Sequence, residues 1–416
     1  MKNKIIYLAI SIMLLTVVRA QGQEELNGYL ITAAGNNPGL KVKFNRYMAA
    51  LKVGPQVSAL PDPKFAFAWF IRPVETRVGP QNVKLSLTQM FPWFGTLSAR
   101  NDVAVQQAKA KYELFEEARS KLYYDVKATY YELYFIKKAT GILKENIAIL
   151  ETFNKLALIK IEAGMVSAVD ELRIRMEIGD LENRLALLRD SYFAKLVAFN
   201  NLLNVEANST VNIPDELWDE NIAGERKAIL DSIKINNHRL LSNDFEYESF
   251  LSKEQSARRT GMPNISIGVD YIFTGKSDNP VPEPAESGRN AVIFPKIGIT
   301  IPIYRKKYNA MINEAGYLQN VATETKADNL NKLETLLEKI IKDYNDAKRR
   351  YELYERQTEL ARQALQLLQS EYSTGETDFA ELLRIERKLL NYALELQRAR
   401  TDKNVAVAFV EYLMGK

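Results

Sequence analysis

Two long stretches of the chain carry apolar residues in alternating steps of three and four. Neither stretch, at residues 96–163 and 305–374, contains a proline, so each can form one continuous helix. The earlier stripe consists of Leu122, Val126, Thr129, Leu133, Ile136, Thr140, Leu143, Ile147, Leu150, Asn154, Ala157 and Ile161. The later stripe consists of Leu333, Leu337, Ile340, Tyr344, Ala347, Tyr351, Tyr354, Thr358, Ala361, Leu365, Leu368 and Tyr372. A period near 3.5 predicts helices that supercoil on a neighbour.

A second apolar stripe lies beside the first one in both stretches. Its members are Phe135, Ala139, Ile142, Ile149, Phe153 and Leu156, and later Leu353, Leu360, Ala364 and Leu367. A helix with two adjacent stripes can contact one neighbour on each side, which suits a curved wall of helices. A helix in an ordinary bundle core has an equally broad apolar face, so the pattern alone leaves both arrangements open.

The two stretches belong to an internal duplication at an offset of 211 residues, which pairs Gly164 with Gly375. Each glycine fits the left-handed position that ends a helix, and an antiparallel helix of about forty residues follows. The expected organisation is a first repeat at 21–204 with a helical hairpin at 96–204, an equatorial or linker segment at 205–236, and a second repeat at 237–416 with a hairpin at 305–414.

Each hairpin follows two runs of alternating apolar and other residues, which predict strands at about 64–74, 81–91, 264–274 and 291–301. The alternating apolar residues are Phe65, Phe67, Trp69, Ile71, Val83, Leu85, Leu87, Ile265, Ile267, Val269, Tyr271, Phe273, Ile293, Ile297, Ile299 and Ile301. Runs of this length are typical of outer-membrane barrels, and a soluble β-sandwich is the alternative. Four strands cannot close a barrel, which needs at least about eight. The barrel interpretation therefore requires an oligomer, and three copies supply twelve strands.

The first twenty residues predict a secretory signal peptide. A basic start containing Lys2 and Lys4 precedes an apolar run from Ile5 to Val18, and Ala20 provides a small residue at the cleavage point. An uncleaved membrane anchor is the alternative. No later segment reaches the ~18 uncharged apolar residues that a membrane-spanning helix needs. Since the sequence contains no cysteine, we expect neither disulfides nor a lipidated N-terminal cysteine.

Composition argues against nucleic-acid binding and against catalysis. Beyond residue 20 the chain has 53 basic and 52 acidic residues, so the basic footprint of a nucleic-acid-binding protein is missing. His238 is the only histidine, which excludes histidine-based triads and multi-histidine metal sites. The sequence shows no phosphate-binding glycine loop and no soft-metal cluster. We therefore expect a protein that is not an enzyme, has no cofactor and draws its energy from a partner.

Several short motifs resemble those of the TolC family of outer-membrane efflux proteins, in order, over nearly the whole chain beyond residue 20. They are Asn37-Pro38, Leu60-Pro61-Asp62-Pro63, Phe91-Pro92-Trp93-Phe94-Gly95, Met262-Pro263-Asn264, Ile301-Pro302-Ile303-Tyr304 and the two hairpin glycines. The resemblance implies a mainly α-helical protein that forms a trimer. Its four strands per protomer would join a 12-stranded membrane β-barrel, and its coiled-coil helices would form a periplasmic α-barrel with a small equatorial domain.

The Pro-Asp-Pro and Phe-Pro-Trp-Phe-Gly motifs look most like the heavy-metal-efflux branch, with CzcC-like and CusC-like members. CusC-like proteins resemble lipoproteins with an N-terminal cysteine, and this sequence departs from that pattern. The resemblance implies a passive duct in the outer membrane of a Gram-negative bacterium. Its implied partners are outer-membrane lipid, a periplasmic adaptor (membrane fusion protein) and an inner-membrane pump of the RND type.

By the same resemblance, the hairpin ends would contact the adaptor. The residues concerned are Gly164, Met165, Val166, Ser167, Gly375, Glu376, Thr377 and Asp378. Ordinary turn chemistry explains the two glycines equally well. The adaptor contact is therefore an expectation that depends on the family resemblance.

The family closes its periplasmic mouth with acidic residues and a tyrosine-centred polar network. Asp170 and Glu381 both lie six residues after their glycine, and Tyr372 lies three before Gly375. In a trimer each carboxylate would form a ring of three like charges that biases gating and cation passage. Arg384 occupies a site where some members have a second acidic residue, and it could instead pair with a neighbouring carboxylate. Solvated helix surface is the alternative for all four residues.

The sequence thus predicts the outer-membrane channel of a tripartite efflux system, which exports small molecules or metal cations. A duct for type I protein secretion has the same architecture and remains an alternative. A periplasmic coiled-coil scaffold or adaptor is a third possibility, but it leaves the four symmetrically placed strands unexplained. The sequence leaves open the exported substrate, the pump and adaptor that the duct serves, and the resting state of the gate.

Overall fold

The computed structural model describes residues 22–164, 167–277, 292–374 and 379–416. The predicted signal peptide and the tip residues Met165, Val166, Gly375, Glu376, Thr377 and Asp378 lie outside the described residues. The chain divides into two compact units, and each unit contains segments from both repeats. The first unit comprises residues 1–43, 115–238 and 329–416, and the second comprises residues 44–114 and 239–328.

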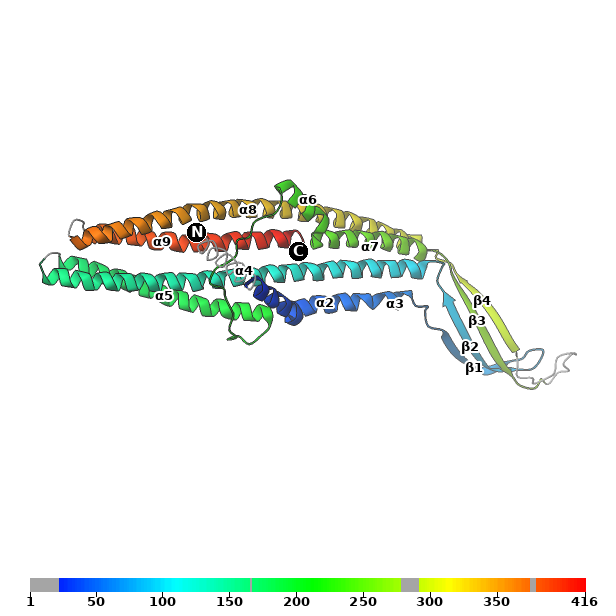
Figure 1. Ribbon diagram of the computed structural model, residues 1–416. Coiled ribbons are helices and arrows are strands. Elements are labelled where there is room, and N and C mark those ends of the chain that lie inside the picture. The colour runs from blue at the N-terminus through cyan, green and yellow to red at the C-terminus, as the bar shows by residue number, and fades with distance from the viewer. Residues whose placement is uncertain (1–21, 165–166, 278–291, 375–378) are drawn as a thin grey trace, which may run out of the picture. The chain divides into compact units, whose positions relative to one another are not determined.

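Four long helices dominate the structure and confirm the predicted coiled-coil helices. They are α4 (Thr96–Glu162), α5 (Ala168–Leu203), α8 (Arg305–Thr374) and α9 (Phe379–Leu413). In the first unit, α5 returns beside α4 and α9 returns beside α8, as Figure 1 shows. With its 70 residues, α8 extends over roughly 100 Å.

The predicted first stripe packs inside the helical unit. Every one of its residues in α4 and α8 is buried or half-buried. Leu143, Leu150 and Ala157 of α4 contribute to a core with residues of α5, α8 and α9. Burial of these side chains is worth roughly 1.5–3 kcal/mol for each large aliphatic group.

The second stripe behaves differently in the two long helices. In α4 it is buried or half-buried by helices of the same chain. In α8, by contrast, Leu353, Leu360 and Leu367 are 41%, 59% and 67% exposed. These three leucines are seven residues apart and form one row on the helix surface. The single chain therefore leaves an apolar seam of α8 uncovered.

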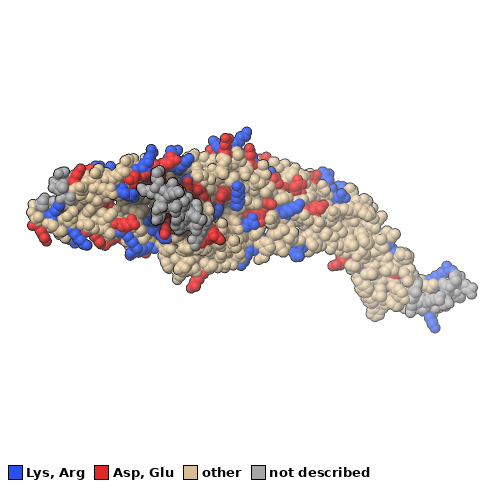
Figure 2. All heavy atoms as spheres, in the orientation of Figure 1, with Lys and Arg blue, Asp and Glu red and all other residues tan. Residues whose placement is uncertain are grey.

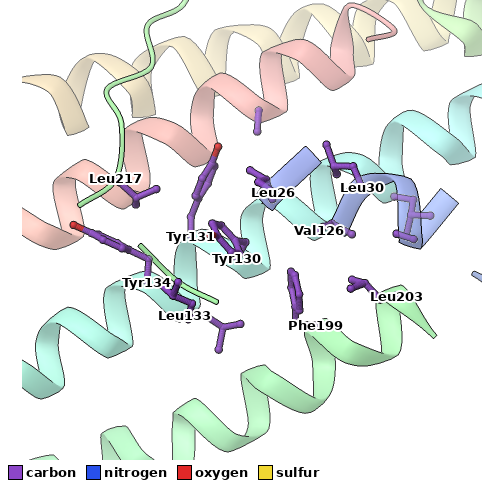
Figure 3. Packing of buried hydrophobic residues seen from close by; sticks show 14 of the residues in the cluster. Leu26, Leu30, Val126, Tyr130, Tyr131, Leu133, Tyr134, Phe199, Leu203 and Leu217 are labelled. Atoms are coloured by element: carbon purple, nitrogen blue, oxygen red, sulfur yellow. The ribbon is translucent and has the colours of Figure 1, made fainter. Parts of the chain in front are cut away.

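A second core of the helical unit contains three tyrosines of α4, shown in Figure 3. Tyr130, Tyr131 and Tyr134 are fully buried and pack with Phe199 of α5 and Leu217. Two of their hydroxyl groups donate hydrogen bonds, from Tyr130 to the carbonyl oxygen of Asn212 at 3.1 Å and from Tyr134 to Oε1 of Gln397 at 3.0 Å. This pairing removes the cost of burying a phenol.

Shorter helices complete the chain. Residues 22–36 are helical, and α2 (Pro38–Leu51) follows directly. Asn37 ends the first segment and caps the second, because its Oδ1 accepts from the backbone NH of Leu40 at 3.0 Å. Residues 205–225 contain no helix or strand and lead into α6 (Arg226–Asn236). The assignment of 205–236 to an equatorial domain stays a prediction.

In the second unit, α3 (Val53–Ser58) and α7 (His238–Thr260) accompany a four-stranded sheet. The strands are β1 (Lys64–Val74), β2 (Gln81–Phe91), β3 (Asn264–Thr274) and β4 (Val292–Thr300). They lie in the order β1-β2-β3-β4 with antiparallel neighbours (Figure 1). The four predicted strands are present, and β1 and β4 form the edges of this sheet.

The strand register collects the apolar side chains on one face. Phe65 pairs with Leu87, Leu87 with Val269, and Val269 with Pro295, so alternate residues of all four strands share one side. Many of them are exposed, and Trp69 reaches 73%. In the view of Figure 2, charged groups are scattered along the helices and are sparse over the strands.

The junction between β2 and α4 explains one proline-rich motif. Gly95 has a φ of +74°, which favours glycine, and α4 begins at the next residue. Arg259 of α7 donates to the carbonyl of Phe94 at 2.9 Å, and the backbone NH of Trp93 donates to Asn264 at 3.3 Å. The motif therefore fixes a sharp turn from strand to helix. Within the described residues, no helix is both long and apolar enough to cross a lipid bilayer.

Candidate functional site at the hairpin ends

At the hairpin ends, Lys160 links α4 to α8. This lysine is only 7% exposed, and its Nζ donates to the carbonyl oxygen of Tyr372 while lying 4.2 Å from the centre of the Tyr372 ring. That carbonyl is in the last turn of α8, where helix carbonyls lack an intrahelical partner and carry partial negative charge. The ring face adds a cation–π contact. Lys160 of the first hairpin therefore caps the C-terminal end of α8 in the second hairpin.

Tyr372, one of the four predicted gate residues, is buried, with its ring facing Lys160. Its ring is 2% exposed and lies 5.4 Å from the ring of Phe379, which in turn contacts Phe153 at 6.3 Å. The aromatic cluster joins α4, α8 and α9. It anchors the ends of both hairpins in one core.

A second polar contact joins α4 to α9 further from the hairpin ends. The amide of Asn146 donates to Oε1 of Glu386, and the two side chains are 6% and 0% exposed. Among the described residues, Glu386 Oε2 and Asn146 Oδ1 find no hydrogen-bond partner. The pKa of Glu386 is raised to about 7, mainly because the side chain is buried. The charge of Glu177 also raises this pKa, whereas the hydrogen bond from Asn146 and the charge of Arg387 lower it.

Glu177 and Arg387 form an ion pair between α5 and α9 beside this carboxyl group. The side chain of Glu177 is 12% exposed and that of Arg387 is 53% exposed. The pair is therefore partly desolvated and ties a helix of the first hairpin to a helix of the second. Together with the contacts of Lys160 and Asn146, it connects the two hairpins near their ends.

The other predicted gate residues lie near the start of the returning helices, with Asp170 and Glu381 in the first turns of α5 and α9 and Arg384 in the next turn of α9. Asp170 is 8% exposed, and its carboxylate accepts from Arg173 at 3.4 Å. It follows the cap residue Ser167, whose hydroxyl accepts from the backbone NH of Val169 at 3.2 Å. A carboxylate at a helix N-terminus is stabilised by the helix dipole. The structure therefore turns Asp170 inward within its own chain.

Glu381 and Arg384 are brought together on the exposed surface of α9. Arg384 Nε donates to Glu381 at 2.7 Å, and this hydrogen bond lowers the pKa of Glu381. Arg384 therefore pairs with a neighbouring carboxylate, which is one of the two possibilities that the sequence left open. A pair of this kind in water contributes little stability.

Sequence reasoning missed Lys160, Asn146 and Glu386, although a signal was present. The second stripe of α4 steps from Ile142 to Ile149, and Asn146 occupies the omitted position. Lys160 continues the same stripe by four residues beyond Leu156. A polar residue in an apolar stripe of a long helix is buried with a partner, and this rule would have selected both residues.

Among the described residues, no group of three or more histidine, cysteine, aspartate or glutamate side chains is arranged to hold a metal ion. The site consists of side-chain contacts between helices.

Comparisons with known proteins agree with this architecture. No protein-family model matches the chain. An uncharacterised protein of Haemophilus influenzae is 21% identical over 220 residues, which are 52% of this chain and 47% of that protein. The chain thus spans about half the length of the curated relative that it matches.

Solved structures of outer-membrane channels match nearly the whole chain. OprN superposes with a TM-score of 0.77 at 16% identity, covering 94% of this chain and 90% of OprN. VceC of Vibrio cholerae gives a TM-score of 0.75 at 14% identity, covering 95% and 97%. CusC gives 0.75 at 14% identity, covering 94% and 92%. The chain therefore has the fold of these outer-membrane channels.

Proposed function

We propose that this chain is one protomer of a trimeric outer-membrane duct, the exit channel of a tripartite efflux system. Three sheets close a 12-stranded barrel in the outer membrane, and the long helices form a tube in the periplasm. An inner-membrane pump supplies the energy and passes small molecules or metal cations to the duct through an adaptor. The proposal rests first on the likeness of fold to outer-membrane channels.

Beyond this likeness of fold, the observation on this chain that carries the proposal is a sheet with one apolar and one polar face. One face presents exposed aromatic and aliphatic side chains, such as Phe67 at 63% and Ile297 at 77%. In a soluble sandwich this face would be covered by a second sheet, and the described residues contain only one sheet. Lipid covers such a face equally well, provided that every backbone group has a partner. The free edges of β1 and β4 then require neighbouring copies.

The helical unit gives independent support for neighbouring copies. The row Leu353, Leu360 and Leu367 on α8 is exposed, as are Val169 and Met176 on α5. Seams at heptad spacing on two helices of one chain fit a closed ring in which each protomer contacts one on either side.

The hairpin ends are our proposed adaptor contact and periplasmic gate. Adaptor contact uses Gly164 and Ser167 together with Met165, Val166, Gly375, Glu376, Thr377 and Asp378. Gating uses Asp170, Tyr372, Glu381 and Arg384, and the contacts of Lys160 and Glu386 hold the two hairpins of each protomer together. Opening then requires these interhelical contacts to rearrange.

Cell fractionation tests the proposal. The full-length chain is expected in the outer-membrane fraction, and after extraction it should run on a gel as a detergent-resistant trimer. Conductance in a planar lipid bilayer should accompany the trimer. A deletion strain should become more sensitive to at least one class among metals, dyes and detergents, and the affected class identifies the cargo.

A soluble monomeric chain in the periplasmic fraction would contradict the proposal and favour a coiled-coil scaffold. A deletion strain with normal resistance that fails to secrete one protein would instead favour a duct for type I secretion. Fractionation of the parent strain and the phenotype of the deletion strain together distinguish the three functions.

A further inference from the structure

The face of the sheet opposite the apolar one carries a compact group of charged residues. The carboxylate of Asp270 on β3 accepts from Lys84 of β2 at 2.6 Å and from Lys296 of β4 at 2.7 Å. The side chain of Asp270 is 4% exposed, whereas each lysine side chain is 34% exposed. The surface of this group is therefore formed by the two lysines.

Small neighbours make room for the group. At Gly268, which pairs with Lys296 across the strands, a Cβ atom would lie 2.7 Å from Cε of Lys296 and 2.8 Å from the carbonyl oxygen of Leu87. The absence of a side chain lets the lysine stem cross toward Asp270. The group is thus built into the sheet, since three strands and a glycine determine its geometry.

The charge on this face is strongly unbalanced. The regular register from Lys64 to Trp69 and through β2, β3 and β4 places Lys64, Lys84, Lys296 and Asp270 on one side. The opposite side contains no ionisable residue other than Tyr271 in the same registered part. This registered part of each sheet therefore carries three basic groups and one acidic group on its polar face.

We propose that this face lines the barrel as a cationic ring, which makes the duct selective for anionic solutes. The inference rests on the proposed trimeric barrel, in which lipid takes the apolar face and the lumen takes the polar face. Three copies then contribute nine basic groups and three buried carboxylates. A ring of lysine side chains attracts anions and repels cations in a narrow pore.

A cationic ring in the barrel limits the class of solute that the duct can export. A free divalent metal cation meets a repulsive ring at the barrel, whereas an organic anion or a negatively charged metal complex meets an attractive one. The substrate class that fits the described lumen face is therefore a small solute bearing carboxylate, phosphate or sulfonate groups.

Reversal potentials across a planar bilayer of zwitterionic lipid test the inference. With a tenfold KCl gradient, the full-length trimer is expected to pass chloride in preference to potassium. Lys84→Gln and Lys296→Gln should each lower the chloride-to-potassium permeability ratio severalfold, and Asp270→Asn should raise it. Opposite signs for the two kinds of substitution separate a charge effect from a general change of pore shape.

Lys253→Gln is the matched control, because it removes a lysine from an ion pair with Glu314 on α7 and α8, outside the sheet. It should leave the ratio unchanged. Trimer stability in detergent is measured for every variant, so a misassembled protein is recognised. A conducting trimer that prefers potassium, with a ratio unchanged in all three sheet variants, overturns the inference while leaving the duct intact. A chain without conductance or trimer contradicts the proposed function instead.

Discussion

Glu386 is a carboxylic acid inside a bundle of long helices, and its environment disfavours the charged form. The side chain is fully buried, one oxygen accepts from Asn146, and the other oxygen has no hydrogen-bond partner in the described part of the chain. The facing charges are Glu177 and Arg387, which form their own ion pair. Burial is the largest influence and raises the pKa of Glu386 to about 7 from an ordinary value of 4.5.

The sign of the resulting pH dependence follows from proton linkage. The folded state binds the proton more tightly than the unfolded state, so this contribution to stability is complete below a pH of about 4.5 and is lost as the pH rises through about 7. The difference between the two pKa values corresponds to a loss of about 3 kcal/mol in the free energy of unfolding at alkaline pH, relative to acidic pH.

Replacing the acid by its neutral isostere should remove this dependence. Glu386→Gln keeps a group that can bond with Asn146, so the variant should melt at a higher temperature than the unmodified protein at pH 8. At pH 5 the two should melt alike. Thermal unfolding followed by circular dichroism at both pH values gives the comparison.

Glu381→Gln is the matched control, because Glu381 is partly exposed and hydrogen-bonded to Arg384. It should give no gain at pH 8. A Glu386→Gln variant with the same rise or fall in melting temperature at pH 5 and pH 8 would show that the carboxyl group does not titrate in this range.

At the scale of the element, the first hairpin depends on one backbone conformation. Gly164 lies two residues beyond the end of α4 with a φ of +67°, and its NH donates to the carbonyl of Ile161 at 2.9 Å. A Cβ atom at this position would meet nothing within 4 Å. The cost of a side chain there is therefore conformational rather than steric.

Two glycine-to-alanine substitutions should have opposite effects on stability. Gly164→Ala forces a left-handed conformation on alanine and should destabilise the fold by about 1 kcal/mol. Gly179 lies within α5, has no positive φ and also has open space at its Cβ, so Gly179→Ala should stabilise by about 0.5–1 kcal/mol. Denaturant unfolding of both variants measures the two shifts. Equal shifts in the same direction would contradict a left-handed turn at residue 164.

The elements themselves were readable from the sequence because their periods are long and regular. A repeat near 3.5 over several turns and alternation over about ten residues each leave few competing interpretations. The contacts at the hairpin ends were not readable in the same way. Asn146 and Glu386 are 240 residues apart, so their meeting depends on the rotation and stagger of two helices from different hairpins.

The predicted gate illustrates the same limit at particular residues. Positions six residues after a hairpin glycine look equivalent in the two repeats, yet Asp170 is buried, whereas Glu381 is half-buried with 41% of its side chain exposed. The difference arises from the rotation of each helix about its axis, which places one carboxylate toward the core and the other toward solvent. An apolar stripe defines the buried face only approximately, and a residue at its border can lie on either side.

At the scale of the whole molecule, the exposed seam of α8 predicts how copies assemble. Leu353, Leu360 and Leu367 recur every seven residues with 41%, 59% and 67% of their surface exposed. A row of this kind on a monomeric protein would carry an unfavourable contact with water. A neighbouring helix that covers the row removes that cost, as in a coiled coil.

A charge in the middle of this row should therefore prevent assembly without unfolding the protomer. Leu360→Glu would bury an unpaired carboxylate in the trimer but leave it in water in the single chain. Arg362→Glu introduces the same side chain two positions away, where the arginine is already exposed and paired with Glu359. We expect gel electrophoresis of detergent extracts to show monomers for Leu360→Glu and trimers for Arg362→Glu, with unchanged helical content in both. Trimers of normal stability from Leu360→Glu would show that this seam faces water or lipid, and the ring would then have to close through another face of α8 or through the sheet edges alone.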